Sequence, residues 1–372
     1  MDFLYLARAL NCCIMGANTN TANEWGPIMK KNLKYDVNID LANETKKAMA
    51  KALNTDNERV LNKIGAFSSL YDIKFKEYKN PVLVLKTEEP GSKQLLAAQY
   101  GKLENVSYDM INHLINDCIV MGAKPLTVQD AIICGKMNKD DINKIVKSVA
   151  DACKKQECVL TGGETSEQPG VLKAGTYILT SSIVGIVEKS KIIDGSKIKE
   201  GNVVISLESS GIHTNGYTLV RKVMKKYPQI LDAKIGKKKF IDVILEPHRC
   251  YYKALKDLFP TNWITGLAHI TGGGICENLN RILPENLSAS IDASKYQILD
   301  IFKLIKNTAN VAEKEMLRTF NLGVGLTVVA KKEHALDIIK HMKANKINAY
   351  VIGEIVKGHK DVIVNGKFDW TM

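Results

Sequence analysis

More than any other feature, a glycine-rich stretch at residues 160–170, Leu-Thr-Gly-Gly-Glu-Thr-Ser-Glu-Gln-Pro-Gly, constrains what this chain can fold into. The run that leads into it is apolar and β-branched, which predicts a buried strand that delivers Gly162 and Gly163 to its end. Glycines there let backbone N–H groups face an anion, and Glu164 and Glu167 offer the hard oxygen ligands that Mg²⁺ prefers. The stretch therefore predicts a metal–nucleotide loop, and a plain glycine turn between strands with solvated glutamates is the alternative.

The length and composition predict a packed protein of two domains. The chain has 372 residues, of which 45% are apolar and 25% charged, and no apolar run approaches the roughly 18 to 20 residues of a membrane span. Asp2 and Arg8 argue against a secretory signal in the hydrophobic opening. A lysine-led pattern begins at Met29, so we expect residues 1–28 to be a disordered or non-native extension.

Cysteine spacing and net charge indicate the compartment and the partners. The eight cysteines include no CxxC pair and no zinc-type spacing, which is typical of reduced thiols in a cytoplasmic protein. The formal net charge of +12 favours anionic partners. Few aromatic residues interleave the lysines, so we expect a phosphorylated small molecule as the partner, and neither nucleic acid nor a membrane.

A helix predicted at residues 109–120 carries an unusual polar face. At 100° per residue, five polar side chains share one arc and apolar side chains share the other. A solvated face would more readily use Lys, Glu and Gln, and no Lys or Arg lies three or four positions from either aspartate. The arc therefore predicts a Mg²⁺ site, with an ordinary amphipathic helix as the alternative; its members are Asp109, Asn112, His113, Asn116 and Asp117.

A second loop suits a metal and a phosphate. Residues 81–86 predict a strand, and Thr-Glu-Glu-Pro-Gly-Ser-Lys follows it at residues 87–93. Two acids, a glycine and Lys93 together fit a metal–phosphate loop, although the spacing is not that of a Walker A motif.

The second half repeats the order of strand, glycine turn and helix. Strand 203–207 leads into a Gly/Ser turn at 209–216 that contains His213, a candidate for proton transfer or phosphate contact, and helix 217–226 follows. We place a domain boundary between residues 195 and 196 and predict an α/β (α+β) fold with an N-terminal mixed-sheet domain and a C-terminal α/β domain. Other expected elements are helices 40–53, 141–154 and 333–344, strands 177–187, 325–329 and 350–356, and a strand before the glycines at 266–274.

Several motifs in the same order resemble those of aminoimidazole ribonucleotide synthetase, the phosphoribosylformylglycinamidine cyclo-ligase family, over residues 37 to 356. Selenophosphate synthetase and thiamine-phosphate kinase belong to the same superfamily. The resemblance rests on Asp109–Asp117 followed by Val-Met-Gly-Ala-Lys-Pro at 120–125, and on residues 162–170, 185–189, 193–195, 209–216, 219–222, 267–274 and 318–321.

The resemblance implies ATP-dependent closure of an imidazole ring, in which formylglycinamidine ribonucleotide becomes aminoimidazole ribonucleotide in purine biosynthesis through a phosphorylated formyl amide. It also implies ATP and Mg²⁺ binding and a homodimer formed by the N-terminal domains, residues 29–195, with residues 196–372 as the C-terminal domain. The residues carried over are Asp109, Asp117 and Glu88 for the metal, Lys93 and His213 for catalysis, and Gly162, Gly163, Glu164, Thr165 and Asn215 for the nucleotide.

One loop departs from the family pattern. Where the family usually has Thr-Asp-Gly-Val-Gly-Thr-Lys, this chain places Glu88, Glu89 and Pro90 in the first half of the loop. A longer carboxylate still reaches a metal, but either Glu88 or Glu89 could be the ligand. The change also motivates a second hypothesis, a nucleotide-binding paralogue without catalysis that has a regulatory or assembly role.

Overall fold

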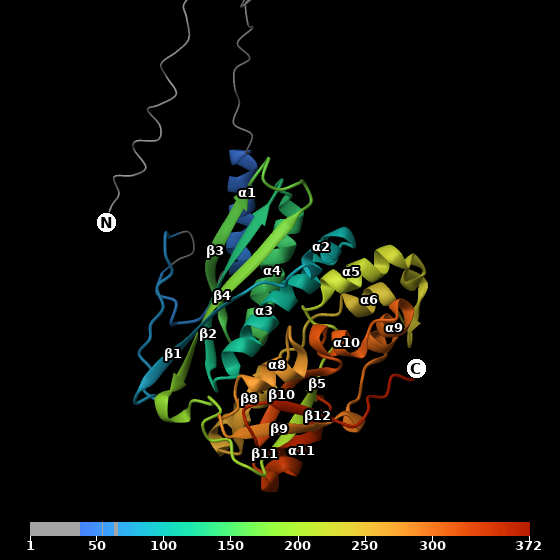
Figure 1. Ribbon diagram of the computed structural model, residues 1–372. Helices are drawn as coiled ribbons and strands as arrows, with labels where there is room; N and C mark the ends of the chain where they lie inside the picture. The colour runs from blue at the N-terminus through green and yellow to red at the C-terminus, as the bar shows by residue number, and fades with distance from the viewer. Residues whose placement is uncertain (1–37, 54, 63–65) are drawn as a thin grey trace, which may run out of the picture. The chain divides into compact units, whose positions relative to one another are not determined.

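The computed structural model describes residues 38–53, 55–62 and 66–372, and the expected extension at residues 1–28 lies outside this part. A four-stranded sheet is built from residues 81–188 and a six-stranded sheet from residues 203–365 (Figure 1). The α/β fold class predicted from the sequence is confirmed. In the part of the chain that the structure describes, no helix combines the length and the apolar character that crossing a bilayer requires.

The N-terminal sheet has the strand order β1-β4-β2-β3, and only β2 and β3 run parallel. Helix α3 packs on β1, β4 and β2, while α4 and α1 pack on β3, so the helices cover one face (Figure 1). The elements are α1 (Ile39–Leu53), β1 (Pro81–Glu88), α2 (Lys93–Gln99), α3 (Leu103–Ile119), β2 (Lys124–Cys134), α4 (Lys139–Lys155), β3 (Val159–Glu167) and β4 (Tyr177–Glu188).

Helix α3 is buried on both of its faces. Its apolar residues, such as Met110 and Leu114, are fully buried towards the sheet, as the 3.6-residue periodicity predicts. Asp109 and Asn116, on the opposite arc, are also fully buried. The alternative of an ordinary helix with a solvated polar face is therefore wrong, and the arc contacts another part of the protein.

The glycine-rich stretch is not the turn that the sequence predicts. Strand β3 continues through Gly162 and Gly163 to Glu167, and neither glycine has a positive φ. The reason is the parallel ladder with β2, which pairs Gly163 with Asp130 and continues to the end of β3. A positive φ first occurs at Gly170, with φ 82°.

The C-terminal sheet has the order β12-β9-β11-β5-β10-β8, antiparallel except between β12 and β9. Its interior strand β10, between β5 and β8, is buried along its whole length, which explains its continuous apolar sequence. The elements are β5 (Val203–Glu208), α5 (Tyr217–Lys226), β6 (Lys234–Ile235), β7 (Lys238–Lys239), α6 (Phe240–Ile244), α7 (Tyr252–Leu255), β8 (Ile264–His269), α8 (Gly274–Asn280), β9 (Leu287–Asp292), α9 (Asp300–Ala309), α10 (Glu313–Thr319), β10 (Val324–Ala330), α11 (Ala335–Ala344), β11 (Ala349–Lys357) and β12 (Val362–Asn365).

Most elements expected from the periodicity are confirmed to within a few residues. Helix α5 has the predicted bounds, and α3 begins six residues earlier than the predicted start at Asp109. Helix α11 begins two residues later than predicted, because residues 332–334 form a 3₁₀ turn. The two sheets lie on either side of residue 195 in sequence, and the exact domain limits remain a prediction.

Candidate active site

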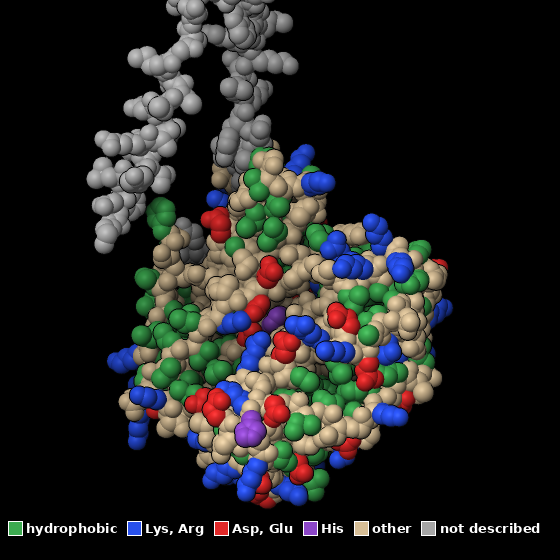
Figure 2. Space-filling view, viewed as in Figure 1, with side chains coloured by type: hydrophobic (Ala, Val, Ile, Leu, Met, Phe, Trp, Pro, Cys, Tyr) green, Lys and Arg blue, Asp and Glu red, His purple; other side chains and the backbone are tan. Residues whose placement is uncertain are grey.

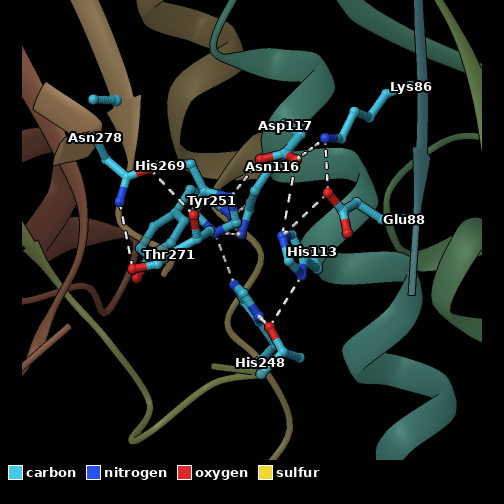
Figure 3. A network of polar contacts seen from close by, with 12 residues as sticks. Lys86, Glu88, His113, Asn116, Asp117, His248, Tyr251, His269, Thr271 and Asn278 are labelled. Atoms are coloured by element: carbon cyan, nitrogen blue, oxygen red, sulfur yellow. Dashed lines mark hydrogen bonds and ion pairs between the residues drawn. The ribbon is translucent and has the colours of Figure 1, made fainter. Parts of the chain in front are cut away.

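The polar arc of α3 is covered by the segment between α6 and α7, residues 246–251. The side-chain amide of Asn112 donates to the carbonyl of His248 at 2.6 Å, and that of Asn116 donates to the carbonyl of Arg249 at 2.8 Å. The backbone N–H of Tyr251 donates to Asn116 Oδ1 at 3.0 Å (Figure 3). The two asparagines thus satisfy backbone groups that would otherwise be buried without partners.

Lys93 and Asp109 form a fully buried ion pair. Lys93 Nζ lies 2.8 Å from Asp109 Oδ1 and donates to the Glu246 carbonyl at 2.7 Å, and the His248 N–H donates to the same Oδ1 at 2.7 Å. Burial raises the pKa of Asp109 to about 6 and lowers the pKa of Lys93, although each charge opposes the shift of the other. The predicted metal and phosphate roles of these residues would both require this pair to open.

Four charged and polar side chains from β1 and α3 form what we call the Glu88–Asp117 cluster: Lys86, Glu88, His113 and Asp117. Lys86 Nζ lies 2.7 Å from Glu88 Oε1 and 3.1 Å from Asp117 Oδ2. His113 Nε2 lies 3.8 Å from Asp117 Oδ2 and 4.0 Å from Glu88 Oε1 (Figure 3). Acidic, basic and histidine side chains gather in a hollow near the centre of the face that Figure 2 shows.

The structure distinguishes the two glutamates of the unusual loop. Glu88 points towards α3 and contacts Lys86, whereas Glu89 is exposed and its backbone N–H donates to Glu88 Oε2 at 3.3 Å. Because side chains alternate along β1, only one of the two faces the helix. That Glu88 binds the metal remains a prediction, but Glu88 is the one that lies beside Asp117.

Burial sets the charge states around the cluster. It lowers the pKa of His113 to about 4 and holds the pKa of His248 well below its ordinary value, and the neighbouring imidazoles add to both shifts. Burial also works to raise the pKa of Asp117, but the hydrogen bond and charge of His269 outweigh it, so this pKa lies below the usual range. Near pH 7, His113 and His248 are therefore neutral and Asp117 is a carboxylate.

A chain of hydrogen bonds leads from Asp117 back to His113. His269 Nδ1 lies 2.7 Å from Asp117 Oδ1, and His269 Nε2 lies 2.9 Å from His248 Nε2. Thr214 Oγ1 lies 3.4 Å from His248 Nδ1 and 3.0 Å from His113 Nδ1. A carboxylate only accepts, so His269 carries a proton on Nδ1. The chain links Asp117 to His113 through two imidazoles and one hydroxyl.

His213 lies in the turn after β5, as predicted, but it is buried. Its ring stacks on His248 with a centroid distance of 3.8 Å, and its Nε2 accepts from the Ser210 N–H at 3.1 Å. Its Nδ1 is buried without a partner, and its φ is 65°, unusual for a residue with a side chain. A role in proton transfer remains a prediction.

Comparisons with known proteins identify the family. Residues 73–187 match the family described as AIR synthase related protein, N-terminal domain, and residues 199–365 match its C-terminal domain. The phosphoribosylformylglycinamidine cyclo-ligase of Carboxydothermus hydrogenoformans is 41% identical over 333 residues, which are 89% of this chain and 96% of the relative. That of Caldanaerobacter subterraneus is 44% identical over 337 residues, 88% and 98% of the two chains. The chain belongs to the phosphoribosylformylglycinamidine cyclo-ligase family. It is therefore an enzyme, a ligase, and the resemblance inferred from the motifs is confirmed.

Solved structures of more distant proteins share the cyclo-ligase fold. HypE of E. coli aligns with a TM-score of 0.62 at 14% identity, over 87% of this chain and 94% of that one. Thiamine-monophosphate kinase of Stenotrophomonas maltophilia aligns with a TM-score of 0.62 at 15% identity, over 88% and 96%. A HypE solved in complex with ATP aligns with a TM-score of 0.60 at 14% identity, over 85% and 88%. These likenesses show that the cyclo-ligase chain has their two-domain fold.

The structure does not bring all predicted site residues of the cyclo-ligase together. Gly162, Gly163, Glu164 and Thr165 lie on β3, at the opposite edge of the N-terminal sheet from Glu88 on β1. Three strand spacings separate the edges, which is roughly 14 Å. Asn215 lies instead beside the glycine turn after β8, where a Cβ on Gly272 would be 3.4 Å from its Nδ2. The nucleotide-binding roles of these five residues remain predictions.

Sequence reasoning missed four members of the polar network, Lys86, Thr214, His248 and His269. Lys86 and His269 each stand near the end of a strand that enters a loop with chemistry-bearing residues, which is a usable signal. His248 has no comparable signal, because only folding brings residues 246–251 onto α3.

Proposed function

We propose that this chain closes the imidazole ring of formylglycinamidine ribonucleotide with ATP and forms aminoimidazole ribonucleotide in purine biosynthesis. The observation that carries the proposal is the 41 to 44% identity to cyclo-ligases over 96 to 98% of their lengths. In this proposal the formyl amide oxygen attacks the γ-phosphorus of ATP and ADP leaves. The amidine nitrogen then attacks the activated carbon, and inorganic phosphate leaves with the former amide oxygen.

We assign the metal of MgATP to Glu88 and Asp117. Their carboxylates fit a hard divalent cation, and both already share one cation, the ammonium of Lys86. Bound there, Mg²⁺ would supply neutralisation of phosphate charge during transfer. The side chains retain 22% and 18% exposure, so the proposed ligands are within reach of a solvent-borne nucleotide.

The proposal is tested by ADP release from purified full-length protein with formylglycinamidine ribonucleotide and MgATP. Turnover that depends on both substrates supports it. ATP binding without turnover would overturn it in favour of the non-catalytic paralogue.

A homodimer forms part of the proposal. On β1, Leu83 and Leu85 are 49% and 70% exposed on the sheet face that the helices leave open. Hydrophobic side chains spread over the region of β1 and β4 in Figure 2, which is typical of an interface. Leu85→Glu should shift the molar mass measured by light scattering from dimer to monomer. Leu336→Glu, at an equally exposed leucine on α11, is the matched control and should leave it unchanged.

We further propose that residues 29–195 and 196–372 are the two domains and that the protein works in the cytoplasm. The six cysteines that the structure describes are free thiols, which suits a reducing compartment.

A further inference from the structure

The Glu88–Asp117 cluster brings one imidazole nitrogen and two carboxylate oxygens together. His113 Nε2 lies 3.8 Å from Asp117 Oδ2 and 4.0 Å from Glu88 Oε1. The two carboxylate oxygens can only accept, and a neutral imidazole offers a lone pair on one ring nitrogen. Among the described residues, Lys86 supplies the one cation that contacts both carboxylates. Such a set of acceptors is satisfied by a cation placed among them.

The outer contacts of the cluster have the form that supports a metal ligand. His113 uses its other nitrogen to bind Thr214 Oγ1 at 3.0 Å, and Asp117 accepts from His269 through its other oxygen at 2.7 Å. Metal-binding imidazoles usually donate through the second ring nitrogen, and metal-binding carboxylates are themselves hydrogen-bonded. His113 and Asp117 are also four residues apart on α3, so they project from the same face of the helix.

We propose that the Glu88–Asp117 cluster binds a divalent transition-metal ion, with His113 Nε2 as a nitrogen ligand beside the carboxylates of Glu88 and Asp117, and that it binds Co²⁺, Mn²⁺ or Zn²⁺ more tightly than Mg²⁺. The location rests on the proposed function, and the preference rests on the donors. Mg²⁺ is bound mainly through oxygen, whereas an imidazole nitrogen favours transition ions in the Irving–Williams order.

A neighbouring group of three histidines is a weaker candidate for the same ion. One ligand atom from each of His213, His248 and His269 lies within 4.8 Å of the others. However, His213 Nε2 accepts from the Ser210 N–H, so the neutral ring carries its proton on Nδ1 and has no free lone pair. The rings of His213 and His248 are also stacked on each other, with a centroid distance of 3.8 Å.

Lys86 acts as an internal competitor in this site. Its ammonium contacts both carboxylates, yet its side chain is 37% exposed and can swing into solvent when an ion enters. Lys86→Met should therefore tighten binding of every divalent ion tested. Unchanged or weaker binding by this variant would contradict the placement of the ion between the two carboxylates.

The test is metal binding by full-length protein freed of metal with a chelator. Calorimetric titration with Co²⁺ and with Mg²⁺ should give a Co²⁺ affinity at least about tenfold higher, and Co²⁺ should develop visible absorption bands on binding. His113→Gln should lower the Co²⁺ affinity at least about tenfold and change the Mg²⁺ affinity less than about threefold. His359→Ala, at an exposed histidine, is the matched control and should leave both unchanged.

A second variant guards against misfolding of the buried histidine variant. Glu88→Gln changes a partly exposed ligand and should weaken both ions while the thermal transition is retained. Loss of Co²⁺ binding in His213→Ala with retention in His113→Gln would overturn the proposal and place the ion at the three histidines. Tighter binding of Mg²⁺ than of Co²⁺ by the wild-type protein would overturn the metal proposal, and ADP release with both substrates would still support the proposed function. If the protein bound Co²⁺ more tightly but showed no turnover, only the proposed function would be contradicted.

Discussion

At the scale of single residues, burial changes what the charged groups of α3 can do. Asp109 and Asp117 lie two turns apart on one face, and the sequence treats them alike. In the fold, Asp109 faces Lys93 without solvent, whereas Asp117 contacts Lys86 and His269 and its side chain stays 18% exposed. Equal residue types on one helix therefore have different chemistry, because their surroundings differ.

The buried pair predicts strong coupling between Lys93 and Asp109. Lys93→Met or Asp109→Asn alone should lower the free energy of unfolding by about 3 to 5 kcal/mol, because each leaves the other group buried without its partner. The double variant should lose less than the sum of the two losses. Urea unfolding of the three variants measures the coupling energy. If Asp109→Asn kept full stability and lost only Mg²⁺-dependent turnover, Asp109 would be a metal ligand.

Asp130 on β2 predicts a pH effect. Its Oδ2 is buried without a partner, and burial raises its pKa from 3.8 to about 7 although the residue as a whole is partly exposed. The folded state therefore keeps a proton that the unfolded state loses. The contribution of Asp130 to the free energy of unfolding is fully present below about pH 4 and is lost as the pH rises towards 7. As the pH rises from 4 to 8, the free energy of unfolding of Asp130→Asn should increase relative to that of the wild type by about 2 to 4 kcal/mol. Asp337→Asn, at an exposed carboxylate, should show no such trend in urea unfolding.

At the scale of elements, the lack of room for a side chain explains the glycine at position 163 of β3 better than a need for an unusual backbone conformation does. A Cβ on Gly163 would lie 1.9 Å from Asp130 Oδ1 and 2.4 Å from the Asp130 carbonyl oxygen, whereas one on Gly162 would lie 3.2 Å from Ser69 Oγ. The ladder between β2 and β3 thus needs a small residue at one position. The neighbouring position tolerates a larger one.

These distances predict different outcomes for two adjacent substitutions. Gly163→Ala should lower the free energy of unfolding by about 1 to 3 kcal/mol, since the backbone of β2 must shift, and Gly162→Ala should cost clearly less. Thermal and urea unfolding measure both. Equal losses of ATP affinity in two fully stable variants would instead support the predicted nucleotide-binding role of both glycines.

At the scale of the whole molecule, the contact between α3 and residues 246–251 joins the sequences that form the two sheets. Asn116 satisfies the Arg249 carbonyl and the Tyr251 N–H, which lie more than 130 positions away. Asn116→Ala should cost about 2 to 4 kcal/mol because two buried backbone groups lose their partner. Calorimetry should still show a single transition at a lower temperature. Separation into two transitions would identify Asn116 as the residue that couples the halves.

The sequence by itself determined the local elements and the family. Apolar periodicity predicts α3, α4 and α5, because the spacing of apolar residues that buries one face of a helix can be read directly from the sequence. The motifs gave the cyclo-ligase family and pointed to Glu88, Asp117 and His213. Glu88 and His213 lie at or just after the end of a strand, and Asp117 belongs to the polar arc of α3.

Only the tertiary structure decided which of those residues meet. Strand β3 continues through the residues where a turn was expected, because its hydrogen-bonded pairing with β2 outweighs the tendency of two adjacent glycines to form a turn. Folding buries Asp109 in an ion pair with Lys93. It also places His269 in contact with Asp117, and His248 in contact with His269, although both histidines lie more than 130 positions from Asp117 in the sequence. Periodicity reports which face of an element is apolar, but contacts between distant segments depend on how the elements pack.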